Sequence, residues 1–257
     1  MDFRLLGSLL IDDGTRIYTV DSAKQRVLLT ALLLRAGQTV LKERLADVLW
    51  DGIPPQSADV TLRNYILRLR QNTGSAGARI VTRNGGYLID VDEEELDLHR
   101  FGRLRAVAAE ALGAGQAGRA VQVLNEAFAL WRGQALEDIP CDNLCMDIRQ
   151  KLEEQRIDAL ELKFEAELAL GRHRAMISEL LGLVTAHPLR ERLWELLMVA
   201  LFRAGRQAEA LDTYRRVHRL LGDELGIRPG VQLSSLQRRI LAGDVQLLGP
   251  LVIPGSS

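Results

Sequence analysis

The stretch that decides the fold of this chain is residues 58–89, which read ADVTLRNYILRLRQNTGSAGARIVTRNGGYLI. Its first half predicts a helix, because Leu62, Ile66 and Leu69 recur at the spacing that lines up one apolar face. Gly74 stands where glycine commonly ends a helix, just past the last turn. The apolar stripe indicates that this side of the helix packs against a core.

The opposite side of the helix is polar and basic. It presents Asn64, Leu67, Arg68 and Gln71, with Arg63 at the flank. An amphipathic helix with several arginines is most often a solvated surface helix, so the helix alone does not establish a function. The sequence that follows it has to decide between a solvated face and a binding face.

A β-hairpin is predicted next. Asn84-Gly85 separates two apolar or β-branched runs, which is the strongest short-range signal for a hairpin. Between Asp59 and Arg83, which lies at the hairpin tip, there are five arginines and one aspartate, whereas the whole chain has a formal net charge of −1. Positive charge is therefore concentrated here, as binding to DNA phosphates requires. We interpret the helix as a major-groove reader and the hairpin as a minor-groove wing.

The residues before the helix predict the rest of a winged helix-turn-helix. We expect an apolar strand over residues 3–11 and a second strand over residues 16–20. Ser22 and Gln25 predict a capping box that opens a first helix. A second helix is expected over about residues 41–50, followed by a turn forced by two prolines. The order strand, strand, helix, helix, helix, hairpin is that of a winged helix with an N-terminal sheet.

These motifs resemble a known family. Leu49-Trp50, residues 63–70 and residues 82–87 are similar to the winged-helix domain of OmpR-type regulators. Residues 130–136, LWRGQAL, and residues 220–230, LLGDELGIRPG, are similar to the bacterial transcriptional activator domain. The combination resembles the Streptomyces antibiotic regulatory protein (SARP) family over about residues 1–244. It implies a mixed fold, an N-terminal α+β winged helix-turn-helix followed by an all-α, tetratricopeptide-like repeat domain.

The second half predicts helices only. Gly171-Arg172 and Gly205-Arg206 are 34 residues apart, which is the tetratricopeptide period, and Gly118-Arg119 looks like an earlier, degenerate copy. Stacked helical hairpins usually present a concave surface to a protein or peptide, but such a stack also packs on a neighbouring domain or forms a dimer. The basic cluster at residues 215–219 is interpreted as a solvated face. The expected helices are about 97–113, 116–131, 143–170, 173–186, 189–204, 206–221 and 231–242.

The domain boundary is expected where the charge turns acidic, after residue 94. We therefore predict a winged-helix DNA-binding domain over residues 1–94, an activator domain over residues 95–244 and a flexible tail over residues 245–257. With no long apolar run and no signal peptide, the chain is expected to be soluble and cytoplasmic, and associated with the nucleoid when bound to DNA.

Catalysis and metal binding have little support in the sequence. Cys141 and Cys145 have no second pair, so free thiols are expected rather than a disulfide or a zinc site. None of the four histidines has a cysteine or carboxylate at metal-ligand spacing. A phosphate-binding glycine loop and a nucleophile elbow are also missing from the sequence. We expect no enzyme activity, no cofactor and no metal.

A set of residues is predicted to contact DNA. If the basic helix enters the major groove, its first turns approach bases or phosphates and Leu67 faces a thymine methyl group. Arg83 is expected in the minor groove, where narrow A·T-rich DNA attracts arginine. Residues nearer the flank and the wing strands are expected at phosphates. The predicted DNA-binding residues are Thr61, Arg63, Asn64, Leu67, Arg68, Arg70, Gln71, Arg79, Thr82 and Arg83.

The family resemblance implies a function beyond the residues themselves. It implies a transcriptional activator of a secondary-metabolite (antibiotic) gene cluster that binds direct repeats in double-stranded promoter DNA. The implied partners are RNA polymerase holoenzyme and a second protomer, side by side on the DNA as a homodimer, without a membrane. Two alternatives stay open, a helical-repeat adaptor that binds protein through its winged helix, and a repressor that uses the same DNA-binding domain.

Overall fold

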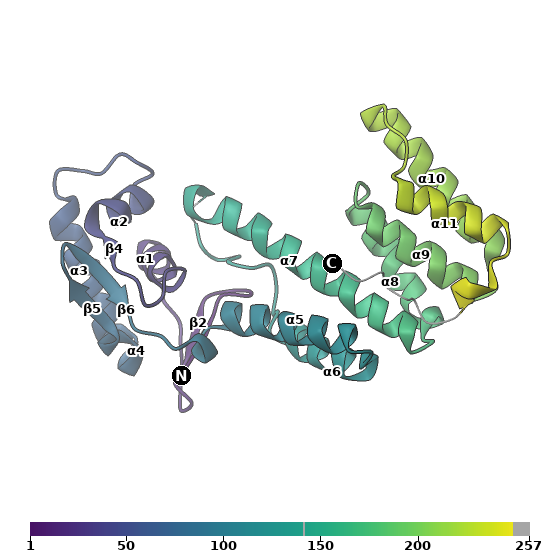
Figure 1. The fold of residues 1–257 in the computed structure, drawn as a ribbon. Helices are drawn as coiled ribbons and strands as arrows, with labels where there is room; N and C mark the ends of the chain where they lie inside the picture. The colour runs from purple at the N-terminus through teal and green to yellow at the C-terminus, as the bar shows by residue number, and fades with distance from the viewer. Residues whose placement is uncertain (141, 249–257) are drawn as a thin grey trace. The chain divides into compact units, whose positions relative to one another are not determined.

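The computed structural model describes residues 1–140 and 142–248, and of residues 142, 143 and 248 it describes the backbone only (Figure 1). The described residues group into two compact units. The first contains Met1–Ala106 and Asn125–Arg156, and the second contains Val107–Leu124 and the chain from Ile157 onward. The elements are β1 (Asp2–Arg4), β2 (Leu10–Asp12), β3 (Ile17–Tyr18), α1 (Ala23–Leu33), β4 (Val40–Leu41), α2 (Lys42–Leu49), α3 (Ala58–Asn72), α4 (Gly74–Ala78), β5 (Ile80–Arg83), β6 (Gly86–Ile89), η1 (Glu93–Glu95), α5 (Asp97–Gly113), α6 (Ala117–Phe128), α7 (Asp142–Ala169), α8 (His173–Ala186), α9 (Glu191–Arg203), α10 (Gln207–Leu225), α11 (Val231–Leu241) and η2 (Val245–Leu248).

The first unit begins with a small antiparallel sheet of order β1-β2-β3, in which Phe3 pairs with Ile11. The expectation of one strand over residues 3–11 is wrong, because the chain turns back between β1 and β2. The turn, residues 5–9, takes its backbone hydrogen bonds from elsewhere in the unit. Asp97, which is 1% exposed at the start of α5, accepts the backbone N–H groups of Leu5 and Leu6 at 2.8 to 2.9 Å.

Residues 130–139, which include the activator-domain motif, also pack on this turn. The backbone N–H of Leu136 donates to the Leu5 carbonyl at 3.0 Å, and that of Arg132 donates to the Leu6 carbonyl at 2.9 Å. Asp138 accepts the backbone N–H of Leu9 at 2.9 Å. Leu136 is fully buried in the core of the unit and has a left-handed backbone, with φ 57°. The motif therefore contributes directly to the folding unit that holds the winged helix.

The winged helix itself is present as the sequence predicts. β5 and β6 form an antiparallel hairpin joined at Asn84-Gly85, and β4 adds to its other edge in the order β4-β6-β5. Gly85 has φ 78°, the left-handed conformation that such a turn needs. A Cβ atom at Gly86 would lie 2.1 Å from the Val40 carbonyl oxygen, so only glycine allows β4 to approach this closely. Helix α4, which begins at Gly74, was not predicted.

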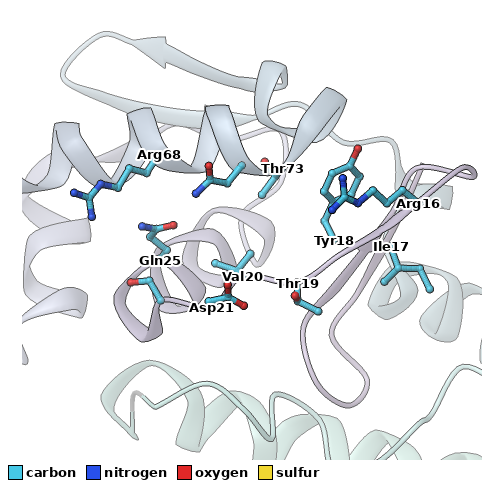
Figure 2. A pocket seen from close by; sticks show the side chains of 11 residues that line it. Arg16, Ile17, Tyr18, Thr19, Val20, Asp21, Gln25, Arg68 and Thr73 are labelled. Atoms are coloured by element: carbon cyan, nitrogen blue, oxygen red, sulfur yellow. The ribbon is translucent and has the colours of Figure 1, made fainter.

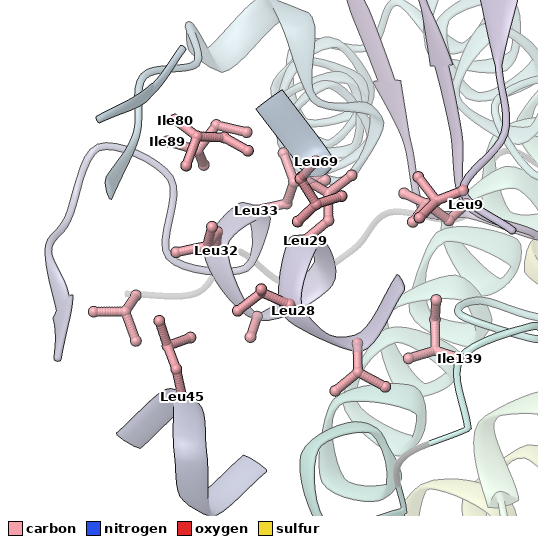
Figure 3. Close-up of a cluster of buried hydrophobic side chains, with 14 of the residues drawn as sticks. Leu9, Leu28, Leu29, Leu32, Leu33, Leu45, Leu69, Ile80, Ile89 and Ile139 are labelled. Atoms are coloured by element: carbon pink, nitrogen blue, oxygen red, sulfur yellow. The ribbon is translucent and has the colours of Figure 1, made fainter. Parts of the chain in front are cut away.

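A single hydrophobic core joins these elements (Figure 3). Leu28, Leu29, Leu32 and Leu33 of α1 lie at its centre, and each is at most 1% exposed. Around them pack side chains of α2, α3, the hairpin strands and the segment before α7, among them Leu45, Leu69, Ile80, Ile89 and Ile139. Burying a leucine or isoleucine stabilises a fold by about 1.5–3 kcal/mol, so this cluster holds α3 and the wing in place.

The predicted capping box at the start of α1 is wrong. Ser22 has the extended backbone of a cap residue, but its side chain makes no capping hydrogen bond. Gln25 is only 6% exposed and lines a pocket between α1 and α3, so its amide is turned away from the first turn of its own helix. Packing of α1 against α3 overrides the local signal.

The second unit contains a stack of helices, α8 to α11, in which successive helices pack against each other. The backbone is left-handed at Gly171 and Gly205, with φ 75° and 78°. In both turns the amides of the glycine and of the following arginine donate to carbonyls of the preceding helix. The same turn recurs at Gly115 and Gly243, with φ 74° and 65°. The degenerate copy is thus centred on Gly115, because Gly118 lies inside α6. The seven predicted helices agree with α5 to α11 to within a few residues.

The predicted flexible tail begins with an ordered turn. Beyond Asp244 the chain forms η2, in which Leu247 is 2% exposed and its carbonyl accepts a 2.7 Å hydrogen bond from the Arg203 guanidinium. The rest of the predicted tail, residues 249–257, lies outside the described residues. Cys145 is buried in the core of the first unit, and Cys141 lies outside the described residues.

Candidate nucleic-acid interface

The exposed side of α3 forms the centre of the candidate interface. Leu62, Ile66 and Leu69 are at most 1% exposed, so the predicted apolar stripe faces the core. The opposite side is in solvent, and Leu67 there is 52% exposed. Asn64 and Gln71 are exposed on the same face. A helix that leaves a hydrophobic side chain half uncovered among polar ones is suited to contact base edges and thymine methyl groups.

The first turns of α3 carry a weak ion pair. Arg63 donates to Asp59 at 2.8 Å, one turn earlier on the helix, and both side chains are more than half exposed. Exposed pairs of this kind contribute little to stability, so breaking the pair between Arg63 and Asp59 costs little free energy. Thr61, two residues before Arg63 and on the other flank of the helix, is half-buried.

Arg70 and Arg79 have structural partners that the sequence did not reveal. Arg70 donates to the Ile80 carbonyl at 2.9 Å and to the Thr82 hydroxyl at 3.0 Å, which fastens α3 to the wing. Arg79 pairs with Glu95, and the hydrogen bond that Arg79 donates to this carboxylate raises the pKa of the Arg79 guanidinium. Both arginines therefore position the wing, and only their remaining N–H groups are available to DNA.

Arg68 and Arg83 are different. Both are exposed, and neither has a hydrogen-bond or ion-pair partner among the described residues. Arg83 ends β5 at the tip of the hairpin, next to exposed Thr82. Uncompensated positive charge on one side of α3 and on the wing is the electrostatic feature that binding to a polyanion requires.

A pocket of about 700 Å³ adjoins α3 on its Arg68 side (Figure 2). Arg68 and Asn72 of α3, and Thr73 directly after it, line one wall. Residues 16–22 and Gln25 of α1 line the other. Sequence reasoning missed this pocket, because the misread capping box assigned Gln25 to the backbone of its own helix.

The described residues contain no group of three or more histidine, cysteine, aspartate or glutamate side chains placed to hold a metal ion. Within residues 1–140 and 142–248, no helix is long and apolar enough to cross a membrane.

The fold and the basic surface define a class of protein, a winged-helix transcriptional regulator with a helical-repeat domain. Residues 20–89 match the family model described as transcriptional regulatory protein, C terminal, and residues 96–241 match the bacterial transcriptional activator domain. The chain belongs to the bacterial transcriptional activator domain family, and the pairing of the two domains is that of the SARP regulators.

Individual relatives agree with this assignment. Regulatory protein AfsR of Streptomyces griseus is 43% identical over 96% of this chain, which spans only 25% of that protein. Regulatory protein DnrI of Streptomyces peucetius is 36% identical over 95% of this chain and 93% of its own length. The structure of Mycobacterium tuberculosis EmbR, in complex with a low affinity phosphopeptide, superposes with a TM-score of 0.90 at 33% identity, covering 96% of this chain and 68% of that one.

Proposed function

We propose that this chain is a sequence-specific DNA-binding transcriptional activator, which inserts α3 into the major groove and the β5–β6 wing into the adjacent minor groove. The observation that carries the proposal is the exposed face of α3 beside a wing whose tip arginine, Arg83, has no partner in the described part of the chain. The function is one of binding and recruitment, and no reaction is assigned to it.

The residues take different parts in this proposal. Asn64, Leu67 and Gln71 face the base edges, with Thr61 and Arg63 at the end of α3 that enters first. Arg83 enters the minor groove, with Thr82 at the neighbouring phosphates. Arg70 and Arg79 contact phosphate with the N–H groups that the wing does not use. Arg68 completes the basic surface.

The operator is proposed to be a direct repeat in a promoter of a secondary-metabolite gene cluster. Two protomers bind it side by side, with half-sites about 10–11 bp apart so that both lie on one face of the DNA. The helical repeats then contact RNA polymerase, and the site of action is the cytoplasmic nucleoid. The identity to DnrI along nearly all of both chains supports the assignment to an activator family.

We propose that the two functions are separated near residue 94. Residues 1–94 bind DNA, and residues 95–244 activate transcription. The limits of the two family models, at residues 89 and 96, support this boundary. Residues 125–156 belong to the folding unit of the winged helix, so the boundary of function and that of folding differ.

A promoter assay tests the proposal. Purified full-length chain is titrated onto DNA from the gene's own neighbourhood, and protected positions are mapped by footprinting. We expect two protected half-sites one helical turn apart, and transcription by RNA polymerase that rises when both are filled. A chain that binds no DNA even at low salt would overturn the DNA-binding assignment, and binding that lowers transcription would identify a repressor.

A further inference from the structure

The pocket beside α3 contains a buried polar group without a partner. Gln25 is 6% exposed, and its side-chain amide makes no hydrogen bond to any described residue. Figure 2 draws Gln25 on α1 with its amide directed toward the side of α3 that carries Arg68. The amide atoms of Gln25 are not among the fully buried side-chain atoms that lack a partner in the described residues, so they open onto the pocket. A ligand in the pocket can therefore supply the hydrogen bonds that the chain does not.

The other residues that line the pocket indicate the chemical class of the ligand. Arg68 supplies a guanidinium group without a partner in the described chain, and Asn72, one turn later on α3, supplies a second amide. Across the pocket, Ser22 precedes α1 and its side chain does not cap the helix, so the first-turn N–H groups lack a side-chain acceptor. A helix N-terminus of this kind favours an anion, and a guanidinium group with two amides suits a phosphate.

One group in the lining opposes an anion. Asp21 precedes Ser22 and is exposed at the pocket. Arg16 lies further along the same wall, with its guanidinium 5.3 Å from the centre of the Tyr18 ring. The two arginines outnumber the single carboxylate, so the lining carries a net positive charge.

The position of the pocket identifies where the phosphate comes from. An α-helix with its side chains, about 10–12 Å across, fills the major groove, so its two flanks face the two sugar-phosphate strands. One flank of α3 carries Arg70, which is hydrogen-bonded to Ile80 and Thr82 of the wing. The other flank carries Arg68 and Asn72 and forms a wall of the pocket.

We propose that this pocket, formed by Gln25, Ser22, Arg68 and Asn72, receives a backbone phosphate of the operator on the side of α3 opposite the wing. The proposal rests on the DNA-binding function proposed above and assigns Arg68 to phosphate rather than to a base. It makes α1 part of the DNA interface, in addition to α3 and the wing.

The test uses the full-length chain, operator DNA and a series of operators in which one phosphate at a time is replaced by an uncharged methylphosphonate. Gln25→Leu is the principal variant, because the Gln25 amide makes no hydrogen bond within the described chain and its removal leaves no other protein group unpaired. Gln38→Leu, an exposed position beyond the other end of α1, is the matched control.

We expect Gln25→Leu to weaken binding to the natural operator roughly 10-fold, as loss of a hydrogen bond to a charged group does, and Gln38→Leu to leave it unchanged. At one position, replacing the phosphate by a methylphosphonate lowers the affinity of the wild type. The same replacement does not lower the affinities of Gln25→Leu and Arg68→Ala, because these variants have already lost the contact. Arg68→Ala weakens all operator sequences by a similar factor and reduces the salt dependence by about one charge. Asp21→Asn tightens binding.

Three results overturn the proposal while leaving DNA binding intact. The first is that Gln25→Leu, folded as judged by its thermal unfolding, binds as tightly as the wild type. The second is that the affinity lost in Gln25→Leu adds to the affinity lost at every methylphosphonate position. The third is that Arg68→Ala relaxes the preference at one base pair, which assigns Arg68 to a base. Failure of the wild type to bind any DNA would instead refute the proposed function itself.

Discussion

The winged helix and the helical stack use their arginines differently. In the stack, Arg192 donates to both Glu165 and Glu195, and the Glu195 side chain is only 9% exposed. At the surface of the winged helix, Arg68 and Arg83 have no such partners among the described residues. Charges that hold a fold together are compensated within it, whereas charges that serve a ligand are left for the ligand to compensate.

The two kinds of arginine contribute differently to stability. An arginine paired with two carboxylates at a partly buried position loses its hydration, and loss of either carboxylate leaves the arginine charge poorly compensated. An exposed, unpaired arginine contributes little to stability and raises the local positive potential. Substitutions in the stack are therefore expected to change stability, and substitutions on the α3 face are expected to change DNA binding.

The largest change in stability is expected for a substitution of Leu136, a residue at which the domains by sequence and the folding units differ. Leu136 belongs to the activator-domain motif by sequence, but it is fully buried in the core that holds the winged helix. Leu136→Ala should lower the free energy of unfolding by about 2–5 kcal/mol, because it leaves a cavity in a packed core. Urea unfolding followed by circular dichroism measures this. A loss below about 1 kcal/mol would mean that the motif does not stabilise this core.

A smaller, pH-dependent effect is expected at Asp97. Burial raises the pKa of this carboxyl group from 3.8 to about 6. Between these two values the folded protein holds the proton more tightly than the unfolded chain, so stability falls as the pH rises through this window. Asp97→Asn does not titrate there. The stability of the wild type relative to the variant should fall by roughly 1–3 kcal/mol from about pH 4 to about pH 7. A relative stability that rises with pH would contradict this account.

Arg83→Ala is expected to change DNA affinity without changing stability. The variant should keep the unfolding free energy of the wild type, because Arg83 is exposed and has no partner in the described chain. Its affinity for the operator should fall by roughly 1–3 kcal/mol, with the loss concentrated at A·T-rich minor-groove positions. Titration of operators changed only at those positions measures the effect. Equal loss on all sequences would limit Arg83 to a phosphate contact.

The smallest effect concerns the turns of the stack. Gly205 has φ 78°, so Gly205→Ala should cost about 1 kcal/mol of strain. Gly182 lies inside α8, and a Cβ there meets nothing within 4 Å, so Gly182→Ala should stabilise the chain by about 0.5–1 kcal/mol. Thermal unfolding of the two variants should therefore shift in opposite directions. Neither should change the affinity for DNA, and a shift of the same sign in both would refute the role of the turn.

Much of this architecture could be predicted from the sequence, because its signals are local. The stripe of Leu62, Ile66 and Leu69, the Asn84-Gly85 turn and the glycine turns of the stack each depend on a few neighbouring residues. What could not be predicted depends on tertiary packing. The chain reversal after β1 needs Asp97 as an acceptor, about ninety residues away.

The same limit applies to the candidate site. The exposed face of α3 follows from helical periodicity alone. The ties from Arg70 and Arg79 to the wing, and the pocket that contains Gln25, depend on how α1, α3 and the hairpin meet. A capping motif was a reasonable interpretation of Ser22 and Gln25, but a buried position between two helices fixed the glutamine side chain elsewhere.

The central claim is that DNA binding resides in α3 and the wing. The most direct test is the dependence of operator affinity on salt concentration for the wild type, Arg83→Ala and Arg215→Ala, the last an exposed arginine of the stack. Our account predicts a steep dependence for the wild type, a slope smaller by about one charge for Arg83→Ala and no change for Arg215→Ala. A slope that falls for Arg215→Ala but not for Arg83→Ala would place the DNA on the helical stack and contradict the account.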